Sequence, residues 1–304
     1  MQLTVGVPVT RTKYLLETLR SIAAQTIPVA EVIVVNNFAD GDVVAIIAQV
    51  DLPVRLITRE KRLPPIENWN SLLADVKTDW FVLLSDDDYF APDHVEQLTR
   101  VHARYPESRV LHTRVRMVDQ FGVALNLSPL APEYESALDF LWHRSAGFRI
   151  QFLSDFAWHS TSLRAAGGFA DLPSAWGSDD LTVFRVAQKG GLAYGYAATF
   201  NYRMHPNSIS SSYSVEEKFW AIECLLNTYR DDLKTIAVAE GDTGVLISSI
   251  YDILPSFKRR SQRYILASLP WYIQIKLALL GRLGRKPYSI SLITLLRTLV
   301  AKAW

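Results

Sequence analysis

Residues 80–90, with the sequence WFVLLSDDDYF, place five apolar residues and one serine before three carboxylates. The apolar run has the length and the β-forming residues of a strand that is buried on both faces. In open α/β sheets, ligands bind beyond the carboxyl ends of such strands. Three adjacent carboxylates repel one another, so we expect a positive partner among them. A divalent cation, Mn²⁺ or Mg²⁺, held by carboxylates and by substrate phosphates, has the required chemistry.

An alternative reading of the same stretch is an acidic turn that caps the following helix. Pro92 suits a first helical position, and Asp93 suits the positive end of that helix. A cap needs one acidic residue, however, and does not need a buried strand that delivers three. The stretch therefore favours a metal site.

Length and composition are those of a folded enzyme-sized protein. The chain has 304 residues, of which 49% are hydrophobic and 21% charged, which suits one large α/β domain with an appendage or two smaller domains. Cys224 is the only cysteine, so a disulfide framework and a cysteine zinc site are excluded and a reducing cytoplasm is expected. Residues 1–8 enter a strand pattern without the features of a secretory signal.

The net charge of +1 conceals an asymmetry along the chain. Ten of the 32 Lys and Arg residues follow Asp252, and no Asp or Glu follows it. The part of the chain up to Asp252 therefore carries 22 basic and 31 acidic residues, a formal charge of −9. An acidic body with a basic tail indicates that the tail meets an anionic partner.

Strand and helix patterns alternate in the first third of the chain. Strands are predicted at residues 2–9, 31–35, 54–57 and 80–84, and helices at 15–23, 42–50, 69–76 and 95–102. This alternation predicts right-handed βαβ units and a mainly parallel sheet. Farther on, we expect strands at 109–118 and 192–202, helices at 134–142 and 181–189, and an extended segment at 148–158.

Polar residues follow two more of these strands, Thr10-Arg11 after the first and Asn36-Asn37 after the second. They are expected at the same sheet edge as Asp86–Asp88. A nucleotide fits this set, because amides and hydroxyls can bind a base while carboxylates hold ribose and metal. No G-x-G-x-x-G or Walker-type loop follows the first strand, which argues against a Rossmann dehydrogenase and a P-loop NTPase.

Several short motifs follow one another along the chain: VGVPVTR at 5–11, VVNN at 34–37, ENWN at 67–70, DDD at 86–88, GGF at 167–169, DD at 179–180 and YRMH at 202–205. In this order they resemble family 2 of the inverting, GT-A-type glycosyltransferases. The resemblance covers about residues 2–210, with DDD standing for the family's DxD and DD for its ED. It implies a GT-A fold, in which a mainly parallel central sheet is flanked by helices, with a helical C-terminal appendage. Asn36-Asn37 depart from the family by replacing the usual acid that contacts the base.

The resemblance also implies roles for individual residues. Asp179 corresponds to the general base, with Asp180 as the alternate, and Asp88 and His205 to metal ligands. Nucleotide contacts are assigned to Pro8, Thr10, Arg11, Asn36, Asn37, Asn68, Asn70, Asp86 and Asp87, and acceptor contacts to Trp158, His159 and Gly168. Three alternatives stay open: Asp179 as a helix cap, His205 as a structural histidine, and Trp158 as an ordinary buried aromatic.

We expect a catalytic domain at residues 1–215, with a nucleotide-sugar half at about 1–108 and an acceptor half at about 109–215. A helical region at 216–304 follows, with a basic amphipathic tail from about 255. This tail mixes Trp, Lys and Arg with aliphatic residues, which fits a helix in an anionic membrane interface. The alternative is a helical appendage packed on the core or on a second subunit, and a nucleic-acid partner is not expected.

These expectations describe a metal-dependent, inverting glycosyltransferase at the cytoplasmic face of a membrane. Its donor is expected to be a UDP- or dTDP-sugar, its acceptor a hydroxyl of a glycan or lipid-linked molecule, and its setting bacterial surface-polysaccharide synthesis. One alternative is a sugar-phosphate nucleotidylyltransferase, although residues 7–11 lack the Gly-rich loop of that class. The other is a non-catalytic glycan-binding scaffold at the membrane.

Overall fold

The computed structural model describes residues 1–206, 213–236, 241–267 and 269. Contacts divide the chain into two compact units. The first consists of Met1–Phe140, Phe148–Ala170 and Asp179–Pro206, and the second of Leu141–Gly147, Asp171–Ser178 and the described residues after Pro206. Most of the expected catalytic domain therefore lies in the first unit, but two short segments of it belong with the C-terminal helices.

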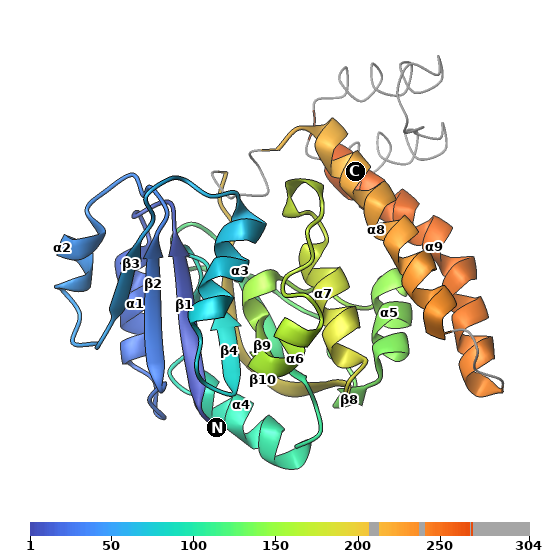
Figure 1. Ribbon diagram of the computed structural model, residues 1–304, viewed down its shortest axis with the longest axis horizontal. Helices are drawn as coiled ribbons and strands as arrows, with labels where there is room; N and C mark the ends of the chain where they lie inside the picture. The colour runs from blue at the N-terminus through green and yellow to red at the C-terminus, as the bar shows by residue number, and fades with distance from the viewer. Residues whose placement is uncertain (207–212, 237–240, 268, 270–304) are drawn as a thin grey trace. The chain divides into compact units, whose positions relative to one another are not determined.

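The first unit begins with a parallel four-stranded half-sheet (Figure 1). Its strands are β1 (Leu3–Val9), β2 (Glu31–Asn36), β3 (Arg55–Thr58) and β4 (Trp80–Leu83), in the order β3-β2-β1-β4. The connecting helices are α1 (Leu15–Ala23), α2 (Val43–Ile47) and α3 (Pro65–Asp75). The alternating pattern thus gives the βαβ units that the sequence predicts.

The sheet continues beyond β4 with mixed strand directions. Strand β9 (Phe156–His159) lies antiparallel between β4 and β6 (Val110–Val118), and β10 (Leu192–Arg203) is parallel to β6. The short strands β5 (Tyr89–Phe90), β7 (Ala124–Leu127) and β8 (Tyr134–Glu135) pair antiparallel with β10 or β6. Helices α4 (His94–Arg104), α5 (Ala137–Ala146), α6 (Ser160–Ala165) and α7 (Ser178–Ala187) and the 3₁₀ turns η1 (Leu153–Asp155) and η2 (Pro173–Ala175) complete the elements before residue 206. Parallel pairing is therefore concentrated in the first half of the sheet.

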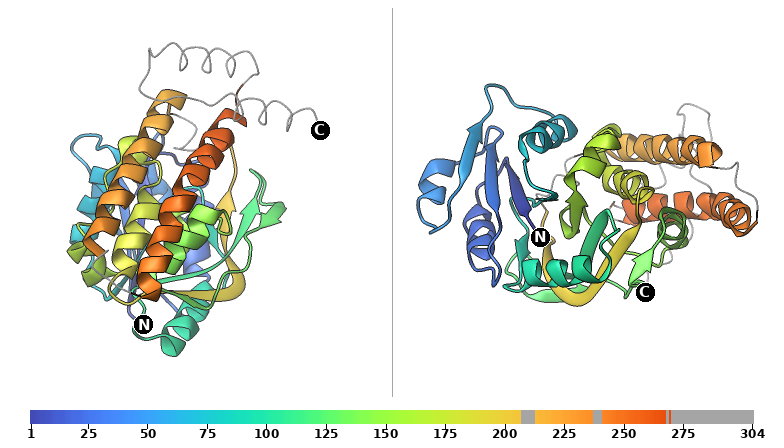
Figure 2. Two further views of the ribbon diagram at one scale, coloured as in Figure 1. Left: turned by 90° about the vertical axis from the view of Figure 1, so that its right-hand side faces the viewer. Right: turned by 60° about the horizontal axis from the view of Figure 1, so that its bottom comes forward.

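Alternation along β1 decides which helix covers which face. Val5, Val7 and Val9 are buried in one cluster with the apolar face of α1. On the other face, a Cβ atom at Gly6 would lie 2.4 Å from Leu72 Cδ2, so α3 packs directly on the strand. Figure 2 shows α1 and α3 on opposite sides of β1 and β2. Burying each such valine or leucine side chain contributes about 1.5–3 kcal/mol to stability.

This packing brings the ends of β1 and β4 to one edge of the sheet. The two strands pair in parallel register from Leu3 opposite Trp80 to Gly6 opposite Leu83. The backbone N–H of Leu84 then donates to the Gly6 carbonyl at 2.9 Å. The loop after β1 and the acidic stretch after β4 consequently leave the sheet side by side.

The second unit contains the long helices α8 (Val215–Ile236) and α9 (Asp242–Ala267), which pack against each other. Lys258 of α9 pairs with Glu223 of α8, and Phe257 and Leu266 are buried. Residues 255–267 are thus part of a packed helix, which moves the start of any membrane-binding tail beyond the predicted residue 255. The rest of the predicted tail lies outside the described residues, apart from residue 269. Among the helices that are described, none combines the length and the apolar character that a bilayer crossing requires.

Candidate active site

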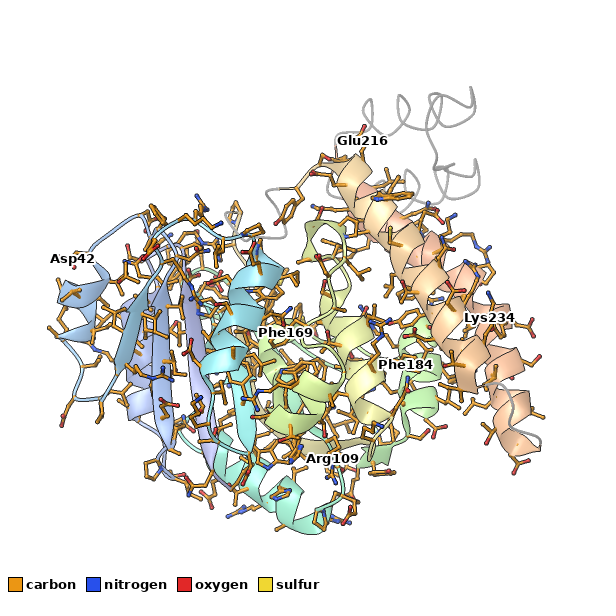
Figure 3. The ribbon with its side chains drawn as sticks, in the orientation of Figure 1. Asp42, Arg109, Phe169, Phe184, Glu216 and Lys234 are labelled. Atoms are coloured by element: carbon orange, nitrogen blue, oxygen red, sulfur yellow. The ribbon has the colours of Figure 1, made fainter. Side chains whose placement is uncertain are left out.

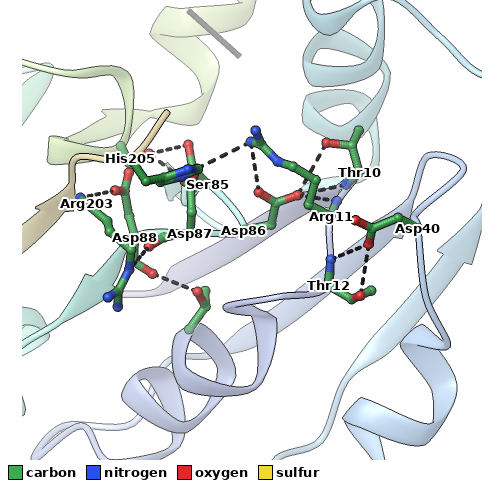
Figure 4. A network of polar contacts seen from close by, with 12 residues as sticks. Thr10, Arg11, Thr12, Asp40, Ser85, Asp86, Asp87, Asp88, Arg203 and His205 are labelled. Carbon is green, nitrogen blue, oxygen red and sulfur yellow. Dashed lines mark hydrogen bonds and ion pairs between the residues drawn. The ribbon is translucent and has the colours of Figure 1, made fainter. Parts of the chain in front are cut away.

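Asp86 joins the end of β4 to the loop after β1 (Figure 4). Its Oδ2 atom accepts hydrogen bonds from the backbone N–H groups of Thr10, at 2.8 Å, and Arg11, at 2.9 Å. The guanidinium of Arg11 also lies 3.4 Å from Asp86 Oδ1 and 3.3 Å from Asp87 Oδ2. Arg11 is therefore one positive partner of the acidic stretch, and Thr10 and Arg11 lie beside Asp86 as predicted.

Burial changes the acid strength of this carboxyl. Burial, together with the neighbouring charge of Asp87, raises the pKa of Asp86 to about 6. The Arg11 guanidinium and the two backbone N–H groups oppose that rise. The site thus holds a carboxylate whose charge is costly without an additional positive partner.

Asp87 and Asp88 have different neighbours. Nε2 of His205 lies 2.8 Å from Asp87 Oδ2. Asp88 is buried, and its Oδ1 accepts the backbone N–H of Arg203 at 2.9 Å. Burial raises the pKa of Asp88 well above its ordinary value, and the charge of Asp87 adds to the effect. The structure therefore brings His205 to the acidic stretch that holds Asp88: Asp87, the residue before Asp88, contacts the imidazole, and Asp88 binds the backbone two residues before His205.

Arg203, to which the sequence analysis assigned no role, ends β10 and fixes this loop to that strand. Its Nε donates to the Asp87 carbonyl at 2.9 Å, and its Nη2 lies 2.6 Å from Glu17 Oε2. The side chain is buried although it is charged. Its position two residues before His205, in the motif that resembles the family's late histidine motif, was the available signal.

The four asparagines assigned to the nucleotide each have a hydrogen-bond partner within the protein. Asn37 is buried and exchanges two hydrogen bonds with the backbone of Leu63, at 2.8 and 2.9 Å. Oδ1 of Asn36 accepts the N–H of Ala39 at 3.0 Å. These amides fix the loops that follow β2 and β3. Pro8 lies within β1, in register with Val35 of β2.

Asn68 and Asn70 of α3 are satisfied in the same way. Oδ1 of Asn68 accepts Nε of Arg59 at 3.1 Å. The amide of Asn70 brackets the backbone of Phe169, accepting its N–H at 2.7 Å and donating to its carbonyl at 3.1 Å. Phe169 is fully buried against Trp69 (Figure 3). The asparagine thus ties the GGF turn to the helix, which corrects its assignment as a nucleotide contact.

Gly168 serves the same turn, and not an acceptor. Its φ of +81° belongs to the region that favours glycine, and a Cβ atom there would lie 2.3 Å from Asn70 Oδ1. The glycine is required by backbone conformation and by the close approach of the asparagine. This explanation replaces the predicted acceptor contact.

Trp158 and His159 lie toward the wrong end of the sheet for an acceptor site. They are opposite Phe81 and Trp80, at the start of β4, whereas Asp86 follows the end of that strand. Trp158 is fully buried in the core, as the alternative reading allowed. Because β9 is antiparallel to β4, the start of β9, and not its end, approaches the acidic stretch.

Asp179 and Asp180 lie in the first turn of α7, where the helix dipole favours negative charge. Asp180 is buried, and its Oδ1 accepts Nε2 of Gln151 at 2.6 Å. The charge of Asp179 acts on the carboxyl of Asp155, and so does the charge of Asp88. Burial, more than these charges, raises the pKa of Asp155 well above its ordinary value. Asp155 thus lies within electrostatic reach of both the metal stretch and the proposed base.

The turn η1 supplies two residues that sequence reasoning missed. Ser154 Oγ accepts the backbone N–H of Ser85 at 3.1 Å and lies 3.0 Å from Ser85 Oγ. Asp155 is buried, and its Oδ1 has no hydrogen-bond partner in the part of the chain that the structure describes. The signal in the sequence was Ser154-Asp155, a polar pair directly before the buried strand β9. It was missed because residues 148–158 were expected to form one extended segment.

The residues fit a divalent cation that also takes ligands from a substrate. Carboxylate oxygens and one imidazole nitrogen suit Mn²⁺ or Mg²⁺. Burial makes the charges of Asp86 and Asp88 costly, so a cation beside them would be favourable. Within residues 1–206, 213–236, 241–267 and 269, however, no three His, Cys, Asp or Glu side chains form a metal-binding group by themselves. Substrate phosphates would have to complete the coordination.

The structure combines a half-sheet of parallel strands that ends in buried carboxylates with a mixed half-sheet that carries a second acidic pair. This combination defines a nucleotide-sugar-dependent transferase of GT-A type. Residues 4–154, about half of the chain, match the family described as Glycosyl transferase family 2. The chain therefore belongs to glycosyl transferase family 2. The predicted enzyme class and fold class are confirmed.

Two relatives illustrate the extent of the likeness. The uncharacterized glycosyltransferase YwdF of Bacillus subtilis (strain 168) is 31% identical over 86 residues, which are 28% of this chain and 32% of that protein. The match thus spans about a third of the relative's length. The crystal structure of S. aureus TarS 1–349 in complex with UDP-GlcNAc is similar with a TM-score of 0.64 and 16% identity, over 92% of this chain and 85% of that one. A complex of TarS 1–349 with UDP gives a TM-score of 0.65.

Proposed function

We propose that this protein transfers a sugar from a nucleotide-sugar donor to a hydroxyl of a glycan or lipid-linked acceptor, with inversion and with Mn²⁺ or Mg²⁺. One observation carries the proposal. The charges of Asp88 and Asp179 act on the same buried carboxyl, that of Asp155. The residue assigned to the metal and the residue assigned to the base are therefore neighbours of one group, as a single-displacement transfer requires.

The donor's diphosphate would lie at the acidic stretch, where Asp88 and His205 would hold the cation. When bound, the cation would stabilise the charge that develops on the diphosphate leaving group. Asp86 and Arg11 would contact the nucleotide from the loop after β1. The solved TarS complexes contain UDP-GlcNAc and UDP, which supports a UDP-sugar as the first donor to test.

Asp179 would accept the proton of the acceptor hydroxyl as it attacks the sugar. A carboxylate near the positive end of α7 is favoured in its charged form, the form that a base needs. Asp179, the counterpart of the general base that the family resemblance gives, is the preferred of the two. Attack from the side opposite the diphosphate would invert the anomeric centre.

The proposed location is the cytoplasmic face of a membrane, in bacterial surface-polysaccharide synthesis. The acid-free, basic sequence after Asp252 supports this location. Flotation of the full chain with vesicles of phosphatidylcholine alone and of phosphatidylcholine with phosphatidylglycerol would test it. Binding confined to the anionic vesicles and lost in 0.5 M salt, on the order of a fivefold shorter screening length than at 20 mM, is expected. Equal recovery with both vesicles would contradict it.

The family match favours glycosyl transfer over the nucleotidylyltransferase alternative. Calorimetric titration with UDP, GDP, dTDP and CDP, each with and without Mn²⁺, tests the proposal and the scaffold alternative together. We expect one nucleotide to bind only with the metal, and Asp88→Ala to lose that binding. Asp51→Asn, at an exposed residue before β3, is the matched control and should bind normally. Absence of metal-dependent binding in the wild type would favour the scaffold.

A further inference from the structure

The segment from Gln151 to Asp155 contains two buried acceptor oxygens without partners. Asp155 is 1% exposed and Gln151 5% exposed. Neither Asp155 Oδ1 nor Gln151 Oε1 has a hydrogen-bond partner among the described residues. A buried, unsatisfied polar group destabilises the folded protein, and more so when it is charged. Two on one short segment therefore call for a ligand with hydrogen-bond donors.

The contacts of this segment fix where it lies. At one end, Ser154 hydrogen-bonds Ser85 and the side chain of Asp88. At the other, Nε2 of Gln151 donates to Asp180 at 2.6 Å. The segment thus connects the acidic stretch after β4 with the first turn of α7. A molecule that reaches from Asp88 to Asp179 would pass the two unpaired oxygens.

The chemistry of the surroundings restricts that molecule. Phosphate and carboxylate groups lack donors and would be repelled by Asp88, Asp155 and Asp179. An apolar group would leave the two oxygens unsatisfied. A sugar ring carries several hydroxyl donors and no charge, so it satisfies both oxygens without adding repulsion.

We propose that Asp155, assisted by Gln151, binds hydroxyl groups of the sugar being transferred and so contributes to the choice of donor sugar. This inference rests on the proposed function. In that function, the diphosphate lies on the Asp88 side and the acceptor on the Asp179 side, and the transferred sugar lies between them. Asp155 is thereby a substrate-binding residue and not a third metal ligand.

The test compares the binding of UDP with that of UDP-GlcNAc, UDP-glucose and UDP-galactose, all with Mn²⁺. In Asp155→Asn and Gln151→Ala we expect UDP to bind as in the wild type. The preferred UDP-sugar should bind about 10- to 100-fold more weakly, the effect of losing one hydrogen bond to a charged group. Deoxy analogues of that donor should identify the hydroxyl. The analogue that lacks it should bind the wild type weakly, and Asp155→Asn should bind that analogue no more weakly than the wild type does.

Thermal unfolding distinguishes a purely structural role of Asp155 from substrate binding. Asp155→Asn replaces a buried carboxyl with an unpaired oxygen at constant shape, so the midpoint of thermal unfolding should stay or rise, whereas loss of a structural carboxyl would lower it. Loss of metal-dependent UDP binding in Asp155→Asn would make this residue a metal ligand and overturn the inference. Unchanged binding of every UDP-sugar would also overturn it, while leaving the proposed function intact. Failure of the wild type to bind any nucleotide would instead overturn the proposed function itself.

Discussion

Nε2 of His205 lies 2.8 Å from Oδ2 of Asp87, and joins the end of β10 to the acidic stretch 118 residues earlier. The family resemblance assigns Asp88, and not Asp87, to the metal together with the histidine. Asp88 instead uses Oδ1 to accept the N–H of Arg203, at 2.9 Å. The middle aspartate is therefore in direct contact with the histidine and belongs to the site.

This contact predicts coupling between the two residues in metal-dependent nucleotide binding. We expect Asp87→Asn and His205→Ala each to weaken binding of the nucleotide with Mn²⁺ by about 10- to 100-fold, the usual effect of removing a group that supports or ligates a metal. Because each acts through the other, the double variant should lose little more than either single one. Calorimetry measures all three, with Asp51→Asn as control. Fully additive losses would show that the pair does not act together.

Asp179 should matter for turnover and not for donor binding. Asp179→Asn removes the proposed base at constant shape, so donor consumption should fall about 10²- to 10⁴-fold while donor affinity changes little. Asp171→Asn alters an exposed carboxylate eight residues earlier and is the control. The steady-state rate of UDP-GlcNAc consumption measures the first effect, and the affinity for UDP-GlcNAc measures the second. If Asp179→Asn kept its rate and Asp180→Asn lost it, the alternate residue would be the base.

The raised pKa of Asp86 predicts a pH-dependent stability cost. Its ordinary value is 3.8 and its folded value about 6, so the folded state binds the proton more tightly between these values. Stability contributed by the protonated form is therefore lost as the pH rises from about 4 to about 6. Asp86→Asn removes this cost. Relative to the wild type, the variant should gain on the order of 2 kcal/mol in unfolding free energy between pH 4.5 and pH 7.

Urea unfolding of metal-free protein at both pH values measures this difference. Asp51→Asn, whose side chain is exposed, should show a constant offset from the wild type. A variant whose advantage shrank at pH 7 would mean that Arg11 and the backbone N–H groups outweigh burial at Asp86.

The two glycines of the GGF turn form a matched pair for stability. Both have positive φ, +91° at Gly167 and +81° at Gly168, but a Cβ atom meets nothing within 4 Å at Gly167 and lies 2.3 Å from Asn70 Oδ1 at Gly168. Gly167→Ala should cost about 1–2 kcal/mol for its conformation. Gly168→Ala should cost about 1–3 kcal/mol more, because the asparagine must move. Thermal and urea unfolding measure both.

Nucleotide affinity checks that Gly168→Ala leaves the nucleotide site intact. Folded Gly168→Ala protein should bind the nucleotide with Mn²⁺ as the wild type does. Equal stability losses in the two glycine variants would mean that the Asn70 bracket is not required.

Local pattern was sufficient for the elements and for one edge of the site. The alternation of strands and helices gave the parallel half-sheet, because parallel strands need helical crossovers. It also placed Thr10, Arg11 and Asp86 together, because the carboxyl ends of parallel strands share an edge. The βαβ pattern does not determine the direction of β9, which runs antiparallel to β4. Trp158 and His159 therefore lie farther from the acidic stretch than the sequence suggested.

The sequence by itself determined the family, the order of the elements and the acidic stretch after β4, since these depend on neighbouring residues and on spacing along the chain. Only the tertiary structure decided which polar side chains are already satisfied. Asn37 and Asn70 have their partners in backbone far along the chain, whereas Asp155 is buried with one oxygen unpaired. The physical reason is that hydrogen-bond satisfaction depends on groups brought together by folding, which no local pattern records.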